Sequence, residues 1–211
     1  MNGEYAISIR YEGVYRGIGK RAIDIIGGGI AIFLSVPFFV IIPILIKLIS
    51  RGPVFYKQER VGKDGKSFML YKFRSMKDEA EKETGPVWVS PNDKRVTPLG
   101  RFLRKTGLDE IPQFFNVLKG EMSIVGPRPE RPFFVEKYSC LQGKRLTVKH
   151  GLFCLAEAEN GTSDHNHDFA CNPEAKVKYD TRYIDNHSFW LDMKIIVLVG
   201  LKLLFQRYNF S

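Results

Sequence analysis

The longest apolar run of the chain extends from Ile25 to Ile46 and contains no charged residue. About 20 apolar residues are enough for a membrane-spanning helix. Lysines and arginines lie on both flanks of the run, whereas a spanning helix usually collects them on one side. Pro37 and Pro43 each favour a kink, and Ser35 could bond a carbonyl that a proline leaves free. The pattern therefore favours a re-entrant helix kinked at Pro37, with a kinked spanning helix and a buried core helix as the alternatives.

A second apolar stretch, Phe189 to Phe205, is interrupted by Asp192, Lys194 and Lys202. Its aromatic and basic residues are types that favour a membrane interface. We expect an amphipathic helix in the headgroup plane or packed on the core, spanning about 188–206. Another helix is expected at about 174–183.

Two runs rich in β-branched and aromatic residues, Val54–Gln58 and Ser67–Phe73, flank the turn sequence KDG at 63–65. This arrangement predicts a β-hairpin. Residues 81–98 contain three prolines and one glycine, and residues 156–173 are polar, so both segments are expected to be loops.

A short basic helix is expected at 99–105, and a second helix follows it. The apolar positions of the second helix fall on one face: Ile111, Phe114, Phe115 and Leu118. Pro112 is tolerated only in a first turn, which places the start near Asp109 or Glu110, and Gly120 is a plausible end.

These elements predict an α+β fold that is mainly helical, with a small β-hairpin, docked on one membrane leaflet. Residues 1–50 would hold the re-entrant helix, and residues 51–211 would form a cytoplasmic domain with interfacial amphipathic helices. No alternating βαβ pattern is visible, so a Rossmann sheet is not expected.

The charge balance is basic: 32 lysines and arginines against 23 acidic residues give a net charge of +9. This favours an anionic partner, which could be nucleic acid, a nucleotide or the anionic inner leaflet. The three cysteines, Cys140, Cys154 and Cys171, show no CxxC spacing, so a disulfide framework or zinc ribbon is not expected. The N-terminus does not resemble a secretory signal.

The candidate chemistry centres on the adjacent carboxylates Asp109 and Glu110. One interpretation is a helix N-cap followed by a first-turn acid. However, arginines and lysines precede the pair at 95–105, and GPRPER follows at 126–131. A carboxylate among cations can stay ionised and act as a nucleophile or metal ligand, while the cations suit phosphate. The combination predicts phosphoryl transfer through an aspartyl-phosphate-type intermediate, assisted by Mg²⁺.

The chain resembles the bacterial sugar transferases, the small monotopic phosphoglycosyl transferases that act on polyprenyl phosphate. The resemblance covers nearly the whole chain, and the block ending in GPRPER is long and specific. The blocks that carry it are KRAIDIIGG at 20–28, GPVFYKQERVGKDGKSFMLYKFRSM at 52–76, NDKRVTPLGRFLRKTGLDEIPQFFNVLKGEMSIVGPRPER at 92–131 and, more weakly, YDTRYIDNHSFWLDMKI at 179–195.

The resemblance implies that Asp109 attacks the β-phosphorus of a UDP-sugar, expels UMP and holds the phosphosugar covalently. Polyprenyl (undecaprenyl) phosphate would then accept the phosphosugar, which starts bacterial glycan assembly. Glu110 would help to hold Mg²⁺. The positions implied to bind the diphosphate and uridine are Lys72, Arg74, Arg104, Pro127, Arg128 and Pro129. The expected location is the cytoplasmic face of the bacterial inner membrane, with membrane lipid as a partner, no nucleic acid, and possible homo-oligomers.

Each of these positions also has a simpler interpretation. Lys72 and Arg74 could decorate a solvated strand face, Arg104 could neutralise lipid headgroups, and GPRP could be a rigid turn. A D-x-x-Y pattern at Asp180 and Tyr183 fits either support of the site or packing.

The chain departs from the family pattern in one loop, where PGITGxxQxNG is replaced by HGLFCLAEAENG at 150–161. His150, Phe153, Cys154 and Glu157 stand for proline, threonine, glycine and glutamine. The sugar is therefore left open, and an inactive or repurposed copy is an alternative. The segment DHNHD at 164–168, close to Cys171, could suggest a metal site, but a solvated loop is the favoured interpretation.

Two other function classes are alternatives to the enzyme. A membrane-anchored nucleic-acid or nucleotide-binding module would fit the charge, but no helix-turn-helix, RRM or zinc-finger signature is present. A non-catalytic scaffold for polysaccharide assembly would leave the intact LDE and GPRP sequences without a purpose.

Overall fold

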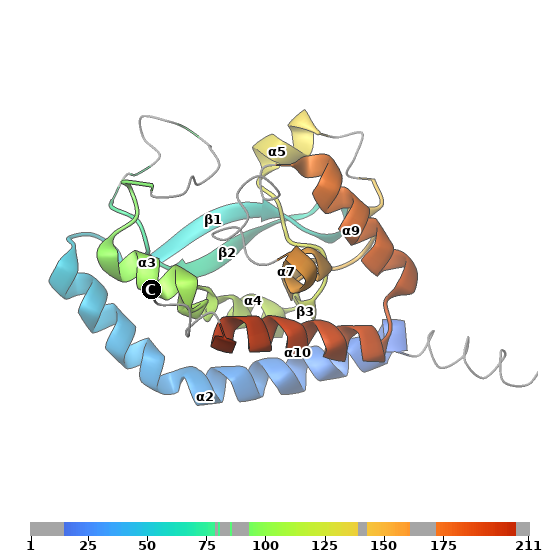
Figure 1. The fold of residues 1–211 in the computed structure, drawn as a ribbon, viewed down its shortest axis with the longest axis horizontal. Helices are drawn as coiled ribbons and strands as arrows, with labels where there is room; N and C mark the ends of the chain where they lie inside the picture. The colour runs from blue at the N-terminus through green and yellow to red at the C-terminus, as the bar shows by residue number, and fades with distance from the viewer. Residues whose placement is uncertain are drawn as a thin grey trace, which may run out of the picture.

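The computed structural model describes residues 15–78, 80, 85, 93–138, 143–160 and 172–205. The elements run along the chain as η1 (Tyr15–Gly19), α2 (Lys20–Ile49), β1 (Phe55–Val61), η2 (Lys63–Gly65), β2 (Ser67–Phe73), α3 (Pro98–Lys105), η3 (Leu108–Glu110), α4 (Gln113–Lys119), β3 (Ser123–Val125), α5 (Pro132–Lys137), η4 (Arg145–Thr147), β4 (Gly151–Phe153), α7 (Leu155–Asn160), α9 (Pro173–Asn186) and α10 (Phe189–Phe205). Figure 1 shows the helices around the long β1–β2 ribbon, with α2 along one side of the molecule. The expectation of a mainly helical fold with a small hairpin is confirmed.

The β-hairpin forms where the sequence predicts it. β1 and β2 pair antiparallel, with Phe55 opposite Phe73 and Val61 opposite Ser67. β1 begins one residue later than expected and ends three residues later, at Val61. The KDG turn becomes the 3₁₀ turn η2, in which Asp64 adopts a positive φ of 57° and Gly65 one of 73°. Glycine and aspartate are among the residues that tolerate this region best.

A second, parallel sheet was not predicted. β3 and β4 pair in parallel, with Ser123 opposite Gly151 and Val125 opposite Phe153, across a connection that contains α5. The backbones approach so closely that a Cβ on Gly151 would lie 2.0 Å from the Gly126 nitrogen. Glycine at both positions is therefore required by the strand contact.

Two helix predictions need correction. α4 begins at Gln113 rather than near Asp109, because Pro112 is its N-cap and the preceding residues 108–110 form the separate turn η3. The helix ends at Gly120, whose φ is 86°, as expected. Residues 155–160, assigned to a loop from 156 onward, form the helix α7. Residues 161–171, and 81–84 and 86–92 of the other expected loop, lie outside the described part of the chain.

α2 is fastened to the rest of the fold at its N-terminal end. Arg21 donates to the carbonyls of Val117 and Leu118 at 2.6 and 2.7 Å, which caps the C-terminus of α4. The Asp24 carboxylate accepts from the Ser123 hydroxyl and the Ile124 amide, both at 2.9 Å. Part of the KRAIDIIGG block therefore binds α4 and β3.

The rest of α2 is largely unpacked. The segment Gly17–Ile49 is long and apolar enough to cross a membrane, and only 11% of its most apolar 18-residue stretch is buried. A core helix of a soluble protein would be mostly buried, so that alternative does not fit. Pro37 and Pro43 lie inside the helix, which is continuous but bows along its length in Figure 1. Ser35 donates to the Ala31 carbonyl at 2.6 Å, a contact that helps to bend helices.

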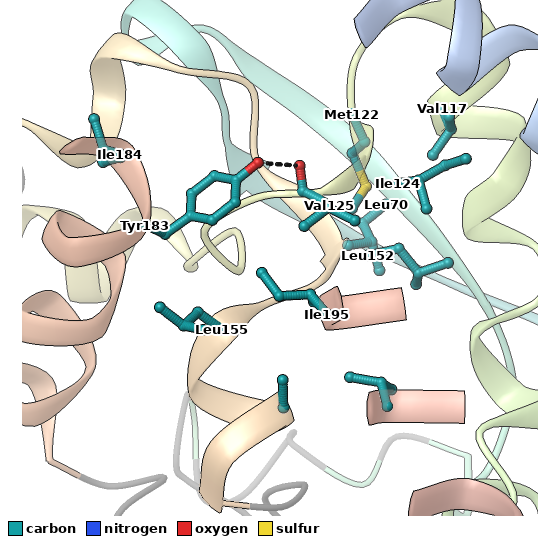
Figure 2. Packing of buried hydrophobic residues seen from close by; sticks show 12 residues of the cluster. Leu70, Val117, Met122, Ile124, Val125, Leu152, Leu155, Tyr183, Ile184 and Ile195 are labelled. Atoms are coloured by element: carbon teal, nitrogen blue, oxygen red, sulfur yellow. Dashed lines mark hydrogen bonds between the residues drawn. The ribbon is translucent and has the colours of Figure 1, made fainter. Parts of the chain in front are cut away.

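The main core lies between the hairpin, the parallel strands and the C-terminal helices. Figure 2 shows Leu70 of β2, Leu152 of β4 and Ile195 of α10 converging there, and the Tyr183 hydroxyl 3.2 Å from the Val125 carbonyl oxygen. A second cluster ties the C-terminal half of α2 to the segment that follows η3. Its buried members are Ile42, Ile46, Phe73, Leu103 and Ile111.

Replacement of Gly100 by alanine is expected to lower the free energy of unfolding by about 2–3 kcal/mol. A Cβ at this position of α3 would lie 1.8 Å from the Ser75 carbonyl oxygen, so α3 would have to move. Gly29→Ala is the matched control, because nothing lies within 4 Å of its Cβ position. Chemical denaturation in detergent micelles measures both, and equal stability of the two variants would contradict the close contact.

Candidate active site

The Asp109–Glu110 pair lies on the short turn η3 between α3 and α4. Gly107, with a φ of 70°, lets the chain turn sharply after α3. The apolar residues on either side, Leu108 and Ile111, pack in the second cluster, and Asp109 itself is only 4% exposed. Asp109 is not the N-cap of α4, so the simple capping interpretation does not apply. The pair is therefore held by its apolar neighbours.

The Glu110 carboxylate is held between two cations from different elements. Lys72 of β2 donates to its Oε1 atom at 2.5 Å, and Arg128 donates to the same oxygen. Burial alone would raise the pKa of Glu110, but Arg128 and Lys72 together lower it to about 2. Glu110 is thus ionised at neutral pH.

Arg128 joins Glu110 to a second carboxylate, Glu157 of α7. Its NH1 group lies 2.8 Å from Oε1 of Glu157 and 3.3 Å from the Leu152 carbonyl oxygen. Burial raises the pKa of Glu157, with Arg128 opposing the rise and Glu110 adding to it. Burial raises the pKa of the Cys154 thiol, and the nearby charge of Glu157 adds to the rise. The result is a continuous chain of charges from β2 to α7.

The GPRPER segment is held rigidly through its main chain. Four consecutive carbonyl oxygens accept hydrogen bonds: Pro127 from Gly151 N at 2.8 Å, Arg128 from Arg145 NH2 at 2.8 Å, Pro129 from Arg60 NH1 at 3.0 Å and Glu130 from Val61 N at 3.0 Å. Pro127 and Pro129 are themselves buried. The GPRPER segment is therefore a rigid turn, and this rigid turn also fixes the position of Arg128.

Arg145 is in turn oriented by Asp180 of α9. Its Nε donates to Oδ2 of Asp180 at 2.7 Å, and both side chains are at most 4% exposed. Burial raises the pKa of Asp180 to about 6, although Arg145 opposes the rise. Asp180 thus supports the site through Arg145, while Tyr183 lies in the main core.

Arg74 and Arg104 donate hydrogen bonds to groups other than Glu110. Arg74 is buried and donates to the carbonyls of Arg51 and Ser50 at 2.8 and 3.0 Å, at the end of α2. Arg104 donates from Nε to the Ser75 hydroxyl at 2.9 Å. Arg74 therefore does not decorate a solvated face, and neither does Lys72, which binds Glu110. Substrate binding by Arg74 and Arg104 stays a prediction.

The sequence patterns did not predict a role in the site for Arg145 or Glu157. No local pattern marked Arg145, whereas Glu157 was visible as a departure from the family loop. The predicted cluster at 164–168, together with Cys171, lies outside the described residues. Within the described residues, no group of three or more histidine, cysteine or acidic side chains forms a metal cage.

The depressed pKa of Glu110 predicts a pH-dependent stability. Because its folded pKa of about 2 lies below the ordinary 4.5, the stabilisation is full above about pH 4.5 and is lost as the pH falls towards 2. The gap in unfolding free energy between the natural protein and Glu110→Gln should shrink on the order of 2 kcal/mol by pH 3. Denaturant unfolding at pH 3–8 measures it; a gap unchanged down to pH 3 would contradict the predicted ionisation.

The chain is similar in sequence to several known proteins. The family model described as bacterial sugar transferase matches residues 15–206. A UDP-glucose:undecaprenyl-phosphate glucose-1-phosphate transferase of Klebsiella pneumoniae is 44% identical over 87% of this chain and 39% of its own length. A putative undecaprenyl-phosphate N-acetylgalactosaminyl 1-phosphate transferase of Bacillus subtilis is 55% identical over 56% of this chain and 66% of its own length. An uncharacterized sugar transferase, EpsL, of the same species is 40% identical over 88% of this chain and 87% of its own length. The chain thus spans less than half of the first relative and about two thirds of the second.

Proposed function

Because the chain belongs to the bacterial sugar transferase family, we propose that it transfers a phosphosugar from a UDP-sugar to polyprenyl phosphate and releases UMP. The relatives' names supply undecaprenyl phosphate as the acceptor and differ in the sugar. The observation that carries the proposal is the η3 turn, where Asp109 stands beside a carboxylate held ionised by two cations. The product would initiate bacterial glycan assembly.

The reaction proceeds in two displacements at one phosphorus atom. A carboxylate oxygen of Asp109 bonds to the β-phosphorus of the UDP-sugar, and the bond from that phosphorus to the oxygen bridging the two phosphates breaks. That oxygen leaves with UMP. A phosphate oxygen of the polyprenyl phosphate then attacks the same phosphorus, which frees the carboxylate and gives the polyprenyl diphosphate sugar.

The cations paired with Glu110, the residue after Asp109, supply the electrostatic part of this mechanism. Arg128 and Lys72 have side chains that are 35% and 21% exposed, so both can be reached by a phosphate. A guanidinium can bind two phosphate oxygens at once, and an ammonium adds a point charge. Both lower the free energy of the negative charge that accumulates during transfer.

Mg²⁺ fits the residues of the site. Lys72 and Arg128 both donate to Oε1 of Glu110, so Oε2 can face a cation. Mg²⁺ is usually held by one or two carboxylates together with substrate phosphates and water, so it needs no cage of three protein ligands. We propose that Glu110 holds the ion, which would neutralise charge on the diphosphate.

The proposed location is the cytoplasmic face of the bacterial inner membrane, with α2 entering and leaving one leaflet through a kink at Pro37. The exposed apolar side chains of α2 support this placement. Phe102 of α3 and Trp190 of α10, which are 51% and 77% exposed, would rest at the interface. Labelling of single cysteines placed at the two ends of α2 should report the same side; opposite sides would mean a spanning helix.

The activity is tested by screening UDP-sugars for UMP release with the purified chain in detergent micelles. With the correct sugar, UMP should appear before polyprenyl phosphate is added, in an amount that matches the enzyme, and turnover should follow on its addition. This is the two-step, ping-pong pattern of a covalent intermediate. A strict requirement for both substrates before any UMP appears would refute the covalent route, and no release with any sugar would favour a non-catalytic scaffold.

A further inference from the structure

Arg128 is held at both ends of its guanidinium by carboxylates from different elements. NH2 pairs with Glu110 of η3, and NH1 pairs with Glu157 of α7. The Glu157 side chain is only 14% exposed. Because α7 packs against α9 and α10, Glu157 is a fixed point rather than a mobile surface acid.

The two ion pairs of Arg128 have different roles. The pair with Glu110 joins Arg128 to the proposed reaction centre, whereas the pair with Glu157 fixes the far end of the guanidinium. A guanidinium held at one end only can swing about its long side chain, and misplacement of a catalytic group by about 1 Å can lower a rate a hundredfold.

The Glu157 charge also opposes the substrate. The carboxylates of Glu110 and Glu157 pair with two cations, Lys72 and Arg128, and Asp109 precedes Glu110 directly in the chain. A diphosphate that binds Arg128 must come close to the negative charge of Glu157. Glutamine, the residue type at this position in the family loop described above, would accept the bond from NH1 without that charge.

We propose that Glu157 is a positioning residue that fixes Arg128 for phosphoryl transfer and weakens binding of the nucleotide diphosphate through its charge. This inference rests on the proposed function, because it assigns Arg128 to the diphosphate of a UDP-sugar.

The experiment compares Glu157→Gln, Glu157→Ala and the control Glu159→Gln. Glu159 lies on the same helix but pairs with Arg182 on the surface, where the two side chains are 38% and 50% exposed. KM and kcat are measured from UMP release, affinity for UDP is measured by calorimetry on the same preparations, and thermal melting verifies folding.

Glu157→Gln should lower KM and the dissociation constant of UDP roughly three- to tenfold, because the charge is lost, while kcat stays within about threefold. Glu157→Ala should lower kcat roughly ten- to a hundredfold, because Arg128 loses its fixed end. Glu159→Gln should match the natural protein. Kinetics of both Glu157 variants equal to the natural protein would overturn the inference, as would an equal loss of kcat in both, which would mean that the carboxylate itself is required.

Failure of the proposed function gives a different result. If the natural protein released no UMP from any UDP-sugar, the function would fall, and UDP affinity alone would decide the inference. Tighter UDP binding by Glu157→Gln than by the natural protein and Glu159→Gln would then sustain the effect of the Glu157 charge on diphosphate binding. Equal or absent UDP binding in all three would overturn it.

Discussion

Replacement of Asp109 by asparagine should lower phosphosugar transfer at least about a thousandfold, because the amide cannot form the bond to phosphorus. Asparagine has nearly the shape of aspartate, and the apolar packing on either side of the position is unchanged, so the variant should fold and associate with membranes. Steady-state UMP release measures the rate. Mass spectrometry of the natural protein, quenched after reaction with a UDP-sugar alone, should find the phosphosugar on the peptide that contains Asp109.

The matched control is Asp185→Asn, on α9, where the aspartate pairs with Lys144 and is 51% exposed. This variant should keep full activity and carry the same adduct. Turnover by Asp109→Asn within tenfold of the natural rate, or an adduct on a different residue, would refute the nucleophile assignment.

Arg145→Met should destabilise the fold by about 2–4 kcal/mol and lower activity as well. The substitution leaves the buried Asp180 carboxylate without its partner and frees the Arg128 carbonyl, so the GPRPER segment loses one of its supports. The loss is limited because Asp180, whose pKa burial already raises to about 6, can take up a proton. Denaturant unfolding and UMP release on the same preparations measure the two effects.

Arg182→Met is the control for Arg145→Met, since an exposed ion pair contributes less than about 1 kcal/mol. The double variant Arg145→Met, Asp180→Asn should recover part of the stability, because position 180 then no longer carries a buried carboxylate that lacks its arginine. A fully stable and active Arg145→Met protein would show that the contact with the Arg128 carbonyl is dispensable.

The elements that could be predicted from the sequence have a long or periodic pattern of apolar residues, or a strong turn signal. The hairpin has the KDG turn between two apolar runs, and α10 has a long apolar stretch. The strands β3 and β4 are three residues each, too short for an alternation to be visible, and their pairing depends on Gly126 and Gly151 lying next to each other. The LAEAEN sequence of α7 is short and rich in polar residues, so by itself it indicates a loop. Its contacts with α9 and α10 depend on the tertiary fold, and no local pattern predicts them.

The site was predictable only in part, for a similar reason. Asp109 and Glu110 are adjacent in the chain, and GPRPER is a recognisable motif, so their residues could be named. That Lys72 and Arg128 meet on one oxygen of Glu110 depends on the tertiary fold. Arg145 acts on a main-chain carbonyl, and no side-chain pattern in the sequence records such a contact.

The packing of α2 also limits how the protein can be altered. Its Arg21 and Asp24 complete hydrogen bonds of α4 and β3, and its Ile42 and Ile46 are buried against Phe73. The helix is therefore not a detachable anchor that any hydrophobic segment could replace. A shortened chain that begins after α2 would be expected to aggregate rather than yield a water-soluble enzyme, and chimaeras with foreign membrane helices would need these four side chains grafted at the same spacing.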